Sequence, residues 1–322
     1  MSKLSDFFSR ELPRVNATLE QELAQLNPLV REVGEHILLS GGKRLRPMLT
    51  ILTARCLGYQ GRDIYPLACS LEFLHSATLI HDDILDNADT RRGQTACHLA
   101  FGLHRTVLAG DALLALANLI VARYDIPAMN YCVAQAIMRT ATGEVEEIAQ
   151  IRSPKPDRAA YLDIIKGKTA DLIRAACSCG AMLAAAGQDQ LDHADSFGLN
   201  VGMAFQLVDD ALDYAADHEL LGKPLGGDLR EGKITLPLIM YLQTLPEDEQ
   251  GKLLHNMAHN RLSDPETQRI IAQIQEMGLD TKVREEAGKY LLLAGQALES
   301  FPDTPEKSLL QEIIEVVRSR KF

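Results

Sequence analysis

The sequence predicts an all-α protein, and three observations support the prediction. Apolar residues recur at spacings of three and four along almost the whole of the 322-residue chain, and no stretch alternates with period two for long enough to require a sheet. Leu, Ala, Ile and Met dominate the apolar residues, whereas aromatic residues make up only 5% of the chain. Gly or Pro clusters interrupt the pattern at helix-length intervals, so we expect about a dozen helices.

The predicted helices follow one another between these interruptions. The interruptions lie, in chain order, near residues 40–42, 58–63, 91–102, 153–157, 187, 222–232, 246, 262–265, 278 and 302–305. Several stretches between them are apolar around much of their circumference, which is typical of helices in the middle of a bundle. These stretches are 66–88, 104–124, 126–150, 168–186 and 190–216.

The last third of the chain has a different character. It is more charged and more plainly amphipathic, so we interpret residues 244–322 as an outer helical layer. No long polar linker separates this layer from the motif-bearing core at about 35–240. We therefore predict a single domain over residues 1–322.

Composition excludes several classes of protein. An apolar fraction of 46% rules out a disordered chain, and a net charge of −11 argues against nucleic acid or an anionic membrane as the main partner. The longest apolar runs, such as 112–122, fall short of the roughly 20 residues of a membrane-spanning helix, so no integral membrane segment is expected. The N-terminus lacks the apolar core of a secretory signal, which predicts a cytoplasmic protein, and we expect the six cysteines to be reduced and packed in helices.

An acidic motif, DDxxD, occurs twice, at 82–86 and at 209–213, and each copy closes an apolar helix. The first and last Asp of each copy are four residues apart and therefore face the same way on a helix. Like charges at this spacing destabilise a helix, so we expect a cation to compensate them. Oxygen ligands without His or Cys suit Mg²⁺, whose remaining positions take water and substrate phosphate. If the two helices face each other, several metal ions can hold a diphosphate between them. For one motif alone, a solvated acidic helix end remains an alternative.

Cations are concentrated at particular loops of this acidic chain. The segment GGKRLRP at 41–47 enters a helix, where Pro47 suits the first turn and free N–H groups favour an anion. Arg91 and Arg92 follow the first acidic motif, and an arginine fork matches phosphate oxygens two at a time. Further candidate cations, each of which alone could be a solvated surface residue, are Lys168, Lys223 and Lys233.

Together these motifs resemble the trans-isoprenyl diphosphate synthases, also called the polyprenyl synthetase family. The matching segments, in the order and spacing of the family, are GGKRLRP at 41–47, HDDILDNADTRRG at 81–93, GD at 110–111, KT at 168–169, FQLVDDALDY at 205–214 and GKPLGGDLREGKITLP at 222–237. The resemblance implies an all-α bundle around a deep central cavity, usually as a homodimer. It also implies head-to-tail condensation of isopentenyl diphosphate with an allylic diphosphate of the farnesyl or geranyl type.

The resemblance further implies roles for individual residues. The principal ligands of roughly two or three Mg²⁺ ions would be Asp82, Asp86 and Asp209, assisted by Asp83, Asp210, Asp213 and Asp228. The allylic diphosphate would be held by Arg91, Lys168, Lys223 and Lys233. Isopentenyl diphosphate would be held by Gly42, Lys43, Arg46, His75 and Arg92. Thr169 and Gln206 would present oxygen dipoles to the allylic cation.

Such a site needs no conventional nucleophile. Metal ions and cations neutralise pyrophosphate as it leaves, and the double bond of isopentenyl diphosphate attacks the delocalised cation that remains. The departing pyrophosphate is expected to take the final proton. Water would quench the cation, so an apolar cavity serves the chemistry.

The segment before the first acidic motif bears on product length. Ala77 and Thr78 stand where family members with short products carry aromatic residues that block the cavity floor. Leu74 and Phe73 come next, so the cavity is expected to extend by at least one turn, about 5 Å, which points to products of roughly 30 to 50 carbons. The resemblance thus favours a long-chain synthase, with octaprenyl diphosphate as the best estimate, of the kind that makes quinone side chains.

Two positions depart from the family pattern. Thr95-Ala96 stands where Pro-Thr is common, which would loosen the loop after Arg92, and Glu147 stands where an amide is common. The second departure places another carboxylate near the expected allylic site.

Other interpretations remain open from the sequence. A geranylgeranyl diphosphate synthase would share the motifs but make a shorter product. His81-Asp82 is also similar to the HD metal phosphohydrolases, a family that leaves the second acidic motif unexplained. A terpene cyclase or squalene-type synthase lacks the full set of isopentenyl-site residues, and a non-catalytic regulatory subunit would carry a damaged acidic motif.

Overall fold

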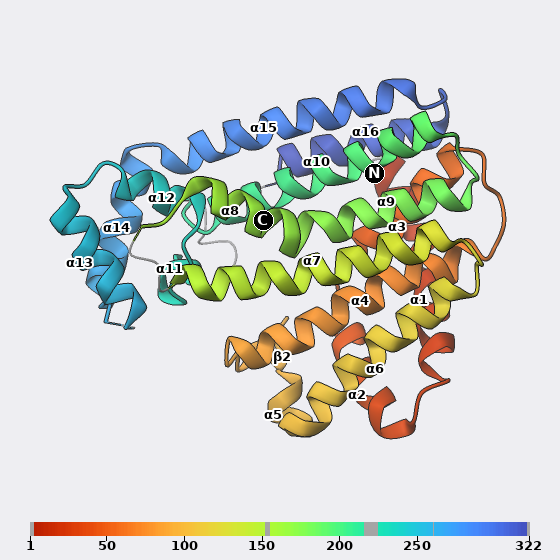
Figure 1. The fold of residues 1–322 in the computed structure, drawn as a ribbon, viewed down its shortest axis with the longest axis horizontal. Coiled ribbons are helices and arrows are strands. Elements are labelled where there is room, and N and C mark those ends of the chain that lie inside the picture. The colour runs from red at the N-terminus through yellow and green to blue at the C-terminus, as the bar shows by residue number, and fades with distance from the viewer. Residues whose placement is uncertain (1–2, 152–154, 216–224, 260, 321–322) are drawn as a thin grey trace. The chain divides into compact units, whose positions relative to one another are not determined.

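The computed structural model describes residues 3–151, 155–215, 225–259 and 261–320. Within these residues the fold is all-α, as predicted, with one small two-stranded hairpin (Figure 1). The helices outnumber the expected dozen because short ones such as α5 and α11 hold too few residues to show a periodic pattern. Of the predicted site residues, Lys223 lies outside the described residues.

The chain divides into two compact units. Unit 1 comprises Met1–Ile137, Leu172–Asp195 and Leu298–Glu312, and unit 2 comprises Met138–Asp171, Ser196–Ala297 and Ile313–Phe322. The first acidic motif therefore belongs to unit 1 and the second to unit 2. The prediction of one domain over the whole chain stays a prediction.

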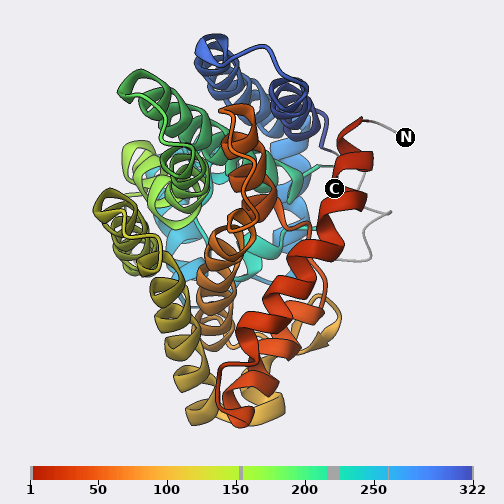
Figure 2. The same cartoon turned by 90° about the vertical axis from the view of Figure 1, so that its right-hand side faces the viewer.

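Unit 1 is built mainly from the first third of the chain. Its elements are α1 Lys3–Leu23, α2 Pro28–Leu39, α3 Leu45–Cys56, α4 Ile64–Leu85, β1 Thr90–Arg91, β2 Gln94–Thr95, α5 Cys97–Phe101, α6 Leu103–Ala122 and the 3₁₀-helix η3 Leu298–Ser300. Helix α4 packs along α6 and also contacts α3 and α1, the long red helix of Figure 2. Because α4 is covered on several sides, every residue from Leu67 to Leu74 is buried, and the predicted all-round apolar helix is confirmed.

Unit 2 contains the elements from the middle and the end of the chain. Those wholly within it are α8 Arg158–Ile165, the π-helix η1 Lys166–Ala170, α11 Gly227–Arg230, α12 Leu236–Leu242, α13 Glu247–Ala258, α14 Asp264–Glu276 and α15 Leu279–Ala297. Helices with residues in both units are α7 Pro127–Ile151, α9 Asp171–Leu183, α10 Gln188–Leu212 and α16 Pro305–Arg318.

The amphipathic character predicted for the last third of the chain is confirmed in α14 and α15. Helix α14 begins at a capping box, in which Ser263 and Glu266 satisfy each other's backbone N–H groups, and Pro265 lies in its first turn. On α15 the buried side chains Leu279, Val283 and Ala287 are spaced by four, while the charged residues Lys282 and Glu285 between them are exposed. One face of each helix is therefore buried within unit 2.

The hairpin β1–β2 was not predicted. Thr90 pairs with Thr95 and Arg91 with Gln94, and the turn residues Arg92 and Gly93 have φ of 51° and 77°. Two consecutive positive φ angles produce the type I′ turn, whose twist matches that of the paired strands. Strands of two residues are too short to show alternation, so the sequence indicated only a break here.

Helix α6 differs from the sequence-based expectation. It is long and apolar enough to cross a membrane by length and composition, although 44% of its most apolar window is buried within the structure. In the sequence, Thr106, Gly110 and Asp111 interrupt the apolar residues, so only the short run 112–122 was counted. The helix continues through these three residues and is therefore longer than that run. The six cysteines are free and buried, as expected.

Candidate active site

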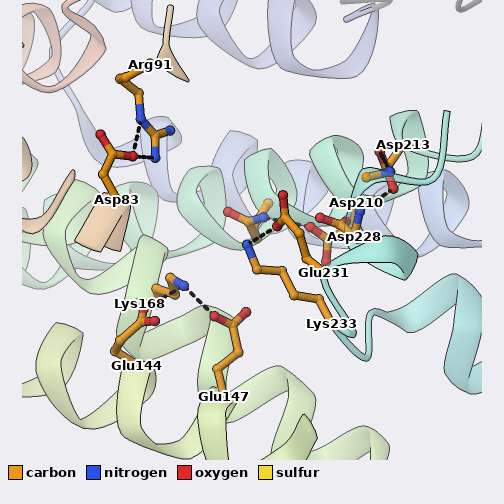
Figure 3. Close-up of polar contacts among 12 residues, drawn as sticks. Asp83, Arg91, Glu144, Glu147, Lys168, Asp210, Asp213, Asp228, Glu231 and Lys233 are labelled. Carbon is orange, nitrogen blue, oxygen red and sulfur yellow. Dashed lines mark hydrogen bonds and ion pairs between the residues drawn. The ribbon is translucent and has the colours of Figure 1, made fainter. Parts of the chain in front are cut away.

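The first acidic motif ends α4, and its carboxylates point in different directions. Asp83 is fully buried, and its Oδ1 accepts a hydrogen bond from Arg91 Nε across 2.7 Å (Figure 3). Burial would lower the pKa of Arg91, but the ion pair with Asp83 raises it above its usual range. Asp82 is half-buried and Asp86 is exposed. The helix thus turns Asp83 inward, whereas Asp82 and Asp86 share the face that the spacing predicted.

The segment before α3 owes its shape to a buried ion pair. Arg44 has a left-handed backbone with φ of 49°, and its side chain is buried with Nη1 2.6 Å from Glu72 Oε1 on α4. Arg44 also donates to the carbonyl of Leu38 at the end of α2. These contacts fix the loop between two helices. Neither Arg44 nor Glu72 was predicted as a site residue, although Arg44 belongs to the cation-rich segment at 41–47 and Glu72 is an acidic residue within an apolar stretch of α4.

Gly42 and Arg92, both predicted to hold isopentenyl diphosphate, lie against each other. Arg92 donates a hydrogen bond to the carbonyl of Gly41, and a Cβ atom on Gly42 would stand 2.9 Å from Arg92 Nη1. Gly42 also has φ of 143°, which L side chains rarely adopt. The backbone conformation at this position therefore favours glycine, and the absence of a side chain leaves room for the Arg92 guanidinium. Lys43, from the same predicted set, is exposed.

Arg46 and His75 join this basic cluster. Burial and repulsion from Arg92 lower the pKa of Arg46 to about 10, while Glu72 opposes the shift. Burial and the charges of Arg46 and Arg92 hold the pKa of His75 well below its usual range. The structure thus brings Gly42, Arg46, His75 and Arg92 into one positively charged neighbourhood of unit 1, and their binding of isopentenyl diphosphate stays a prediction.

The residues predicted to define product length all lie on α4. Phe73, Leu74 and Ala77 are buried, and Thr78 is half-buried with its hydroxyl donating to the carbonyl of His75. Their proposed relation to a product cavity stays a prediction.

Unit 2 contains a cavity of about 210 Å³ that gathers most of the other predicted residues. The predicted residues that line it are Lys168, Thr169, Gln206, Asp209, Asp210, Asp228 and Lys233. Glu147 and Tyr161 also line it. Polar residues from several separate segments therefore converge on one space, which is typical of a binding site.

Lys168 lies in the π-helix η1, between α8 and α9. Its Nζ is 2.6 Å from Glu144 Oε2 and also contacts Glu147, both on α7 (Figure 3). The two helical segments approach closely because both carry glycine. A Cβ on Gly143 would stand 2.9 Å from the backbone nitrogen of Lys168, and one on Gly167 would stand 2.8 Å from the Arg139 carbonyl oxygen. Single π-turns often occur at functional sites.

Asp210 is held by two donors. Its Oδ2 accepts from the Tyr161 hydroxyl across 2.5 Å, and its Oδ1 accepts from Gln206 Nε2 across 2.6 Å. Burial raises the pKa of Asp210 to about 7 despite these two hydrogen bonds, and the charges of Asp209 and Glu147 add to the rise. Asp210 therefore links Tyr161 on α8 to Gln206 on α10 in the wall of the cavity.

The remaining acidic residues of unit 2 have distinct surroundings. Asp213 accepts hydrogen bonds from the backbone N–H groups of Gly227 and Asp228, each across 3.0 Å, and does not line the cavity. Burial and the charges of Asp210 and Asp213 raise the pKa of Asp228 well above its usual range, while Lys233 opposes the shift. Lys233 Nζ is 2.7 Å from Glu231 (Figure 3).

Asp209 is half-exposed and pairs with a residue that the sequence did not indicate. Arg320 Nη2 lies 2.9 Å from Asp209 Oδ1, and the Arg320 guanidinium stacks over the Phe205 ring at 4.4 Å from its centroid. A basic residue near the end of the chain gives no local signal of such a contact.

The donor set suits Mg²⁺. Among the described residues, no three His, Cys, Asp or Glu side chains are close enough to hold a metal ion by themselves. Carboxylate oxygens without nitrogen or sulfur donors are nevertheless the ligands that Mg²⁺ takes, usually one or two per ion with water and phosphate. The buried Asp83 Oδ2 accepts no hydrogen bond from the described side chains, and Asp82 and Asp86 on the same helix end are accessible.

Comparison with known proteins identifies the family. The sequence profile of the polyprenyl synthetases matches residues 27–275. The chain belongs to the polyprenyl synthetase family. It is 33% identical over 310 residues to octaprenyl diphosphate synthase from Escherichia coli, with 96% of each chain covered. It is 32% identical over 330 residues to geranylgeranyl diphosphate synthase from Sulfolobus acidocaldarius, with 100% of each chain covered.

A solved structure agrees with this assignment. The polyprenyl synthase from Caulobacter crescentus, complexed with calcium and isoprenyl diphosphate, superposes with a TM-score of 0.91 at 33% identity, covering 99% of this chain and 97% of that one. This polyprenyl synthetase therefore has the all-α isoprenoid synthase fold and is a trans-prenyltransferase. The phosphohydrolase alternative is excluded by the family assignment.

Proposed function

We propose that this polyprenyl synthetase condenses isopentenyl diphosphate head-to-tail with an allylic diphosphate of the farnesyl or geranyl type and makes a long-chain all-trans product for quinone side chains. The observation that carries the proposal is the unit 2 cavity, where Lys168, Lys233 and Asp209 stand beside the polar oxygens of Thr169 and Gln206. Cations for a leaving diphosphate and oxygen dipoles for a carbocation are the two requirements of the reaction.

The two diphosphates would be held by different sets of residues. Lys168 and Lys233 would hold the allylic diphosphate, together with Arg91 and Lys223. In unit 1, Arg46, Arg92 and His75, with Gly42 and Lys43, would hold isopentenyl diphosphate. A neutral His75 can donate one N–H to a phosphate oxygen without adding to the repulsion among the arginines.

Asp82, Asp86 and Asp209 would hold Mg²⁺, roughly two or three ions in all, with Asp83, Asp210, Asp213 and Asp228 supporting them. When bound, the metal supplies positive charge that stabilises pyrophosphate as a leaving group. Lys168 would exchange Glu144 and Glu147 for phosphate oxygens. Thr169 and Gln206 would then direct oxygen dipoles at the allylic cation, the double bond of isopentenyl diphosphate would attack it, and pyrophosphate would remove the proton.

Product length is proposed from α4. Ala77 contributes little volume one turn before the acidic motif, and Thr78 is small as well. One five-carbon unit extends roughly 5 Å, about the pitch of one helical turn, so Leu74 and Phe73 would meet the chain only after further additions. We propose a product of about 30 to 50 carbons because the small side chains at Ala77 and Thr78 leave room for the growing chain beyond the acidic motif, and we take octaprenyl diphosphate as the best estimate because the relative from Escherichia coli is an octaprenyl diphosphate synthase.

We also propose that the enzyme acts as a homodimer in the cytoplasm. Large apolar side chains are exposed at Leu108 and Leu119 on α6 and at Met138 and Val145 on α7, with exposed fractions of 60–67%. Met138 and Val145 are seven residues apart and Leu108 and Leu119 are eleven apart, and both spacings return to nearly the same helix face, so each helix presents an apolar strip that a second copy would cover. Six free buried cysteines suit a reducing compartment.

The test is to incubate the purified protein with Mg²⁺, farnesyl diphosphate and labelled isopentenyl diphosphate and to size the products by mass spectrometry. Products of about 30 carbons or more support the proposal, whereas products that stop near 20 carbons indicate a geranylgeranyl synthase. No incorporation with any allylic primer overturns the catalytic proposal. Ala77→Phe is expected to shorten the product, and Thr78→Ala, which removes rather than adds side-chain volume, is the matched control.

A further inference from the structure

Tyr161 is a buried tyrosine that no motif of the sequence singled out. It lies on α8, is only 3% exposed and lines the unit 2 cavity. Its hydroxyl donates to Asp210 Oδ2 across 2.5 Å. A phenol with its ordinary pKa of about 10 keeps its proton at neutral pH, so Tyr161 is the donor in this contact.

The hydrogen bond of Tyr161 is the first of three consecutive hydrogen bonds that link Tyr161 to Thr169. Asp210 Oδ1 accepts from Gln206 Nε2 across 2.6 Å, and Gln206 Oε1 accepts from the Thr169 hydroxyl across 2.8 Å. When Asp210 is ionised, its Oδ1 only accepts, so the Gln206 amide meets it through its NH₂ group. Asp210 therefore fixes which end of the Gln206 amide carries the oxygen toward Thr169.

We propose that Tyr161 is a positioning residue for prenyl transfer: by donating to Asp210 it holds the carboxylate that orients the Gln206 carbonyl oxygen toward the allylic cation. The inference rests on the proposed function, in which Gln206 and Thr169 face that cation.

The surroundings of Asp210 explain why one hydroxyl matters. Asp210 is 4% exposed and stands near the negative charges of Asp209 and Glu147. Without the Tyr161 donor, the buried Oδ2 is unsatisfied and the carboxylate can rotate toward another donor. The Gln206 amide then loses its fixed partner and its carbonyl oxygen is no longer directed. An electrostatic contact made mainly in the transition state lowers kcat when it is lost, with little effect on substrate binding.

The chain offers a matched control. Tyr241 is also a buried tyrosine of unit 2, 2% exposed, and its hydroxyl donates to Gln273 Oε1 across 2.6 Å, away from the cavity lining. Tyr161→Phe and Tyr241→Phe each remove one hydroxyl and its hydrogen bond to one side chain. We expect Tyr161→Phe to lower kcat about 10-fold or more at nearly unchanged KM for both diphosphates, and Tyr241→Phe to leave kcat unchanged.

A double-mutant cycle tests whether Tyr161 acts through Gln206. In the Gln206→Leu background, Tyr161→Phe is expected to have little further effect on kcat, because the amide that it orients is absent. Binding of Mn²⁺ to the ligand-free protein, followed by electron paramagnetic resonance, should be the same in wild type and Tyr161→Phe. Equal effects of the two tyrosine variants, additive effects with Gln206→Leu, or a loss of Mn²⁺ affinity that matches the loss of kcat would overturn the inference. A wild-type enzyme that forms no prenyl product would instead overturn the proposed function.

Discussion

Arg320 lies two residues beyond the end of α16 and places its Nη2 2.9 Å from Asp209 Oδ1, so an internal cation already sits on the first carboxylate of the second acidic motif. The guanidinium stacks on Phe205, which limits its motion. Its charge offsets the repulsion between Asp209 and Asp210, which are adjacent in sequence. Any cation that binds Asp209 at this oxygen has to compete with Arg320.

Replacing Arg320 should therefore strengthen metal binding. Arg320→Gln removes the competing charge, and a partly exposed ion pair is worth up to about 1 kcal/mol, so we expect the affinity for Mn²⁺ to rise about 2- to 5-fold. Titration of Mn²⁺ followed by electron paramagnetic resonance measures this affinity. Arg318→Gln is the control, since Arg318 is exposed and pairs with Glu315. Unchanged or weaker Mn²⁺ binding by Arg320→Gln would show that Arg320 does not compete with the metal.

The Arg44–Glu72 pair should be important for stability. Both side chains are buried, so Glu72→Gln leaves the Arg44 charge without its partner and should cost about 3 kcal/mol of the free energy of unfolding. Urea denaturation gives this value. Glu35→Gln breaks the exposed pair with Arg31, whose atoms are 3.5 Å apart, and should cost less than about 0.5 kcal/mol. Similar losses from both substitutions would contradict the prediction.

Gly167 should not tolerate a side chain. Gly167→Ala places a Cβ 2.8 Å from the Arg139 carbonyl oxygen, so α7 and η1 must separate. We expect a loss of about 1 to 3 kcal/mol in stability and a higher KM for the allylic diphosphate, because Lys168 moves with η1. The control is Gly251→Ala in α13, where no atom lies within 4 Å of the added Cβ and a gain of about 0.5 to 1 kcal/mol is expected. Equal thermal stability of Gly167→Ala and wild type would refute the crowding argument.

His75 should make the protein less stable in mild acid. Its pKa in the folded protein is held well below the unfolded value by burial and nearby arginines, so the folded state binds fewer protons. The contribution of His75 to the free energy of unfolding is therefore constant above its unfolded pKa of about 6.5. As the pH falls below that value, this contribution becomes unfavourable by up to about 1.4 kcal/mol per pH unit.

Urea denaturation at two pH values, one above and one below the unfolded pKa, tests this prediction. His75→Gln should lose less stability than wild type when the pH is lowered, whereas a substitution of the exposed His104 on α6 should behave like wild type. The same pH dependence in His75→Gln and wild type would mean that His75 is protonated in the folded protein as readily as in the unfolded one.

The sequence determined the fold class and the long helices, and it supplied the candidate site residues. The spacing of apolar residues and the positions of Gly and Pro reflect local backbone preferences, so they predicted the long helices. The two acidic motifs and the other short motifs are also local, so they indicated the family. The residue types at the two acidic motifs also indicated hard-metal and diphosphate chemistry.

Only the tertiary structure decided which of these residues meet. It separated Asp83, paired with Arg91, from Asp82 and Asp86, and it assigned Asp213 to backbone N–H groups of the following loop. It also added Arg44, Tyr161 and Arg320, because their partners lie on other helices and no local pattern encodes such contacts. Hydrogen bonds and ion pairs depend on distances of about 3 Å, and for residues far apart in sequence only the packing of helices sets those distances.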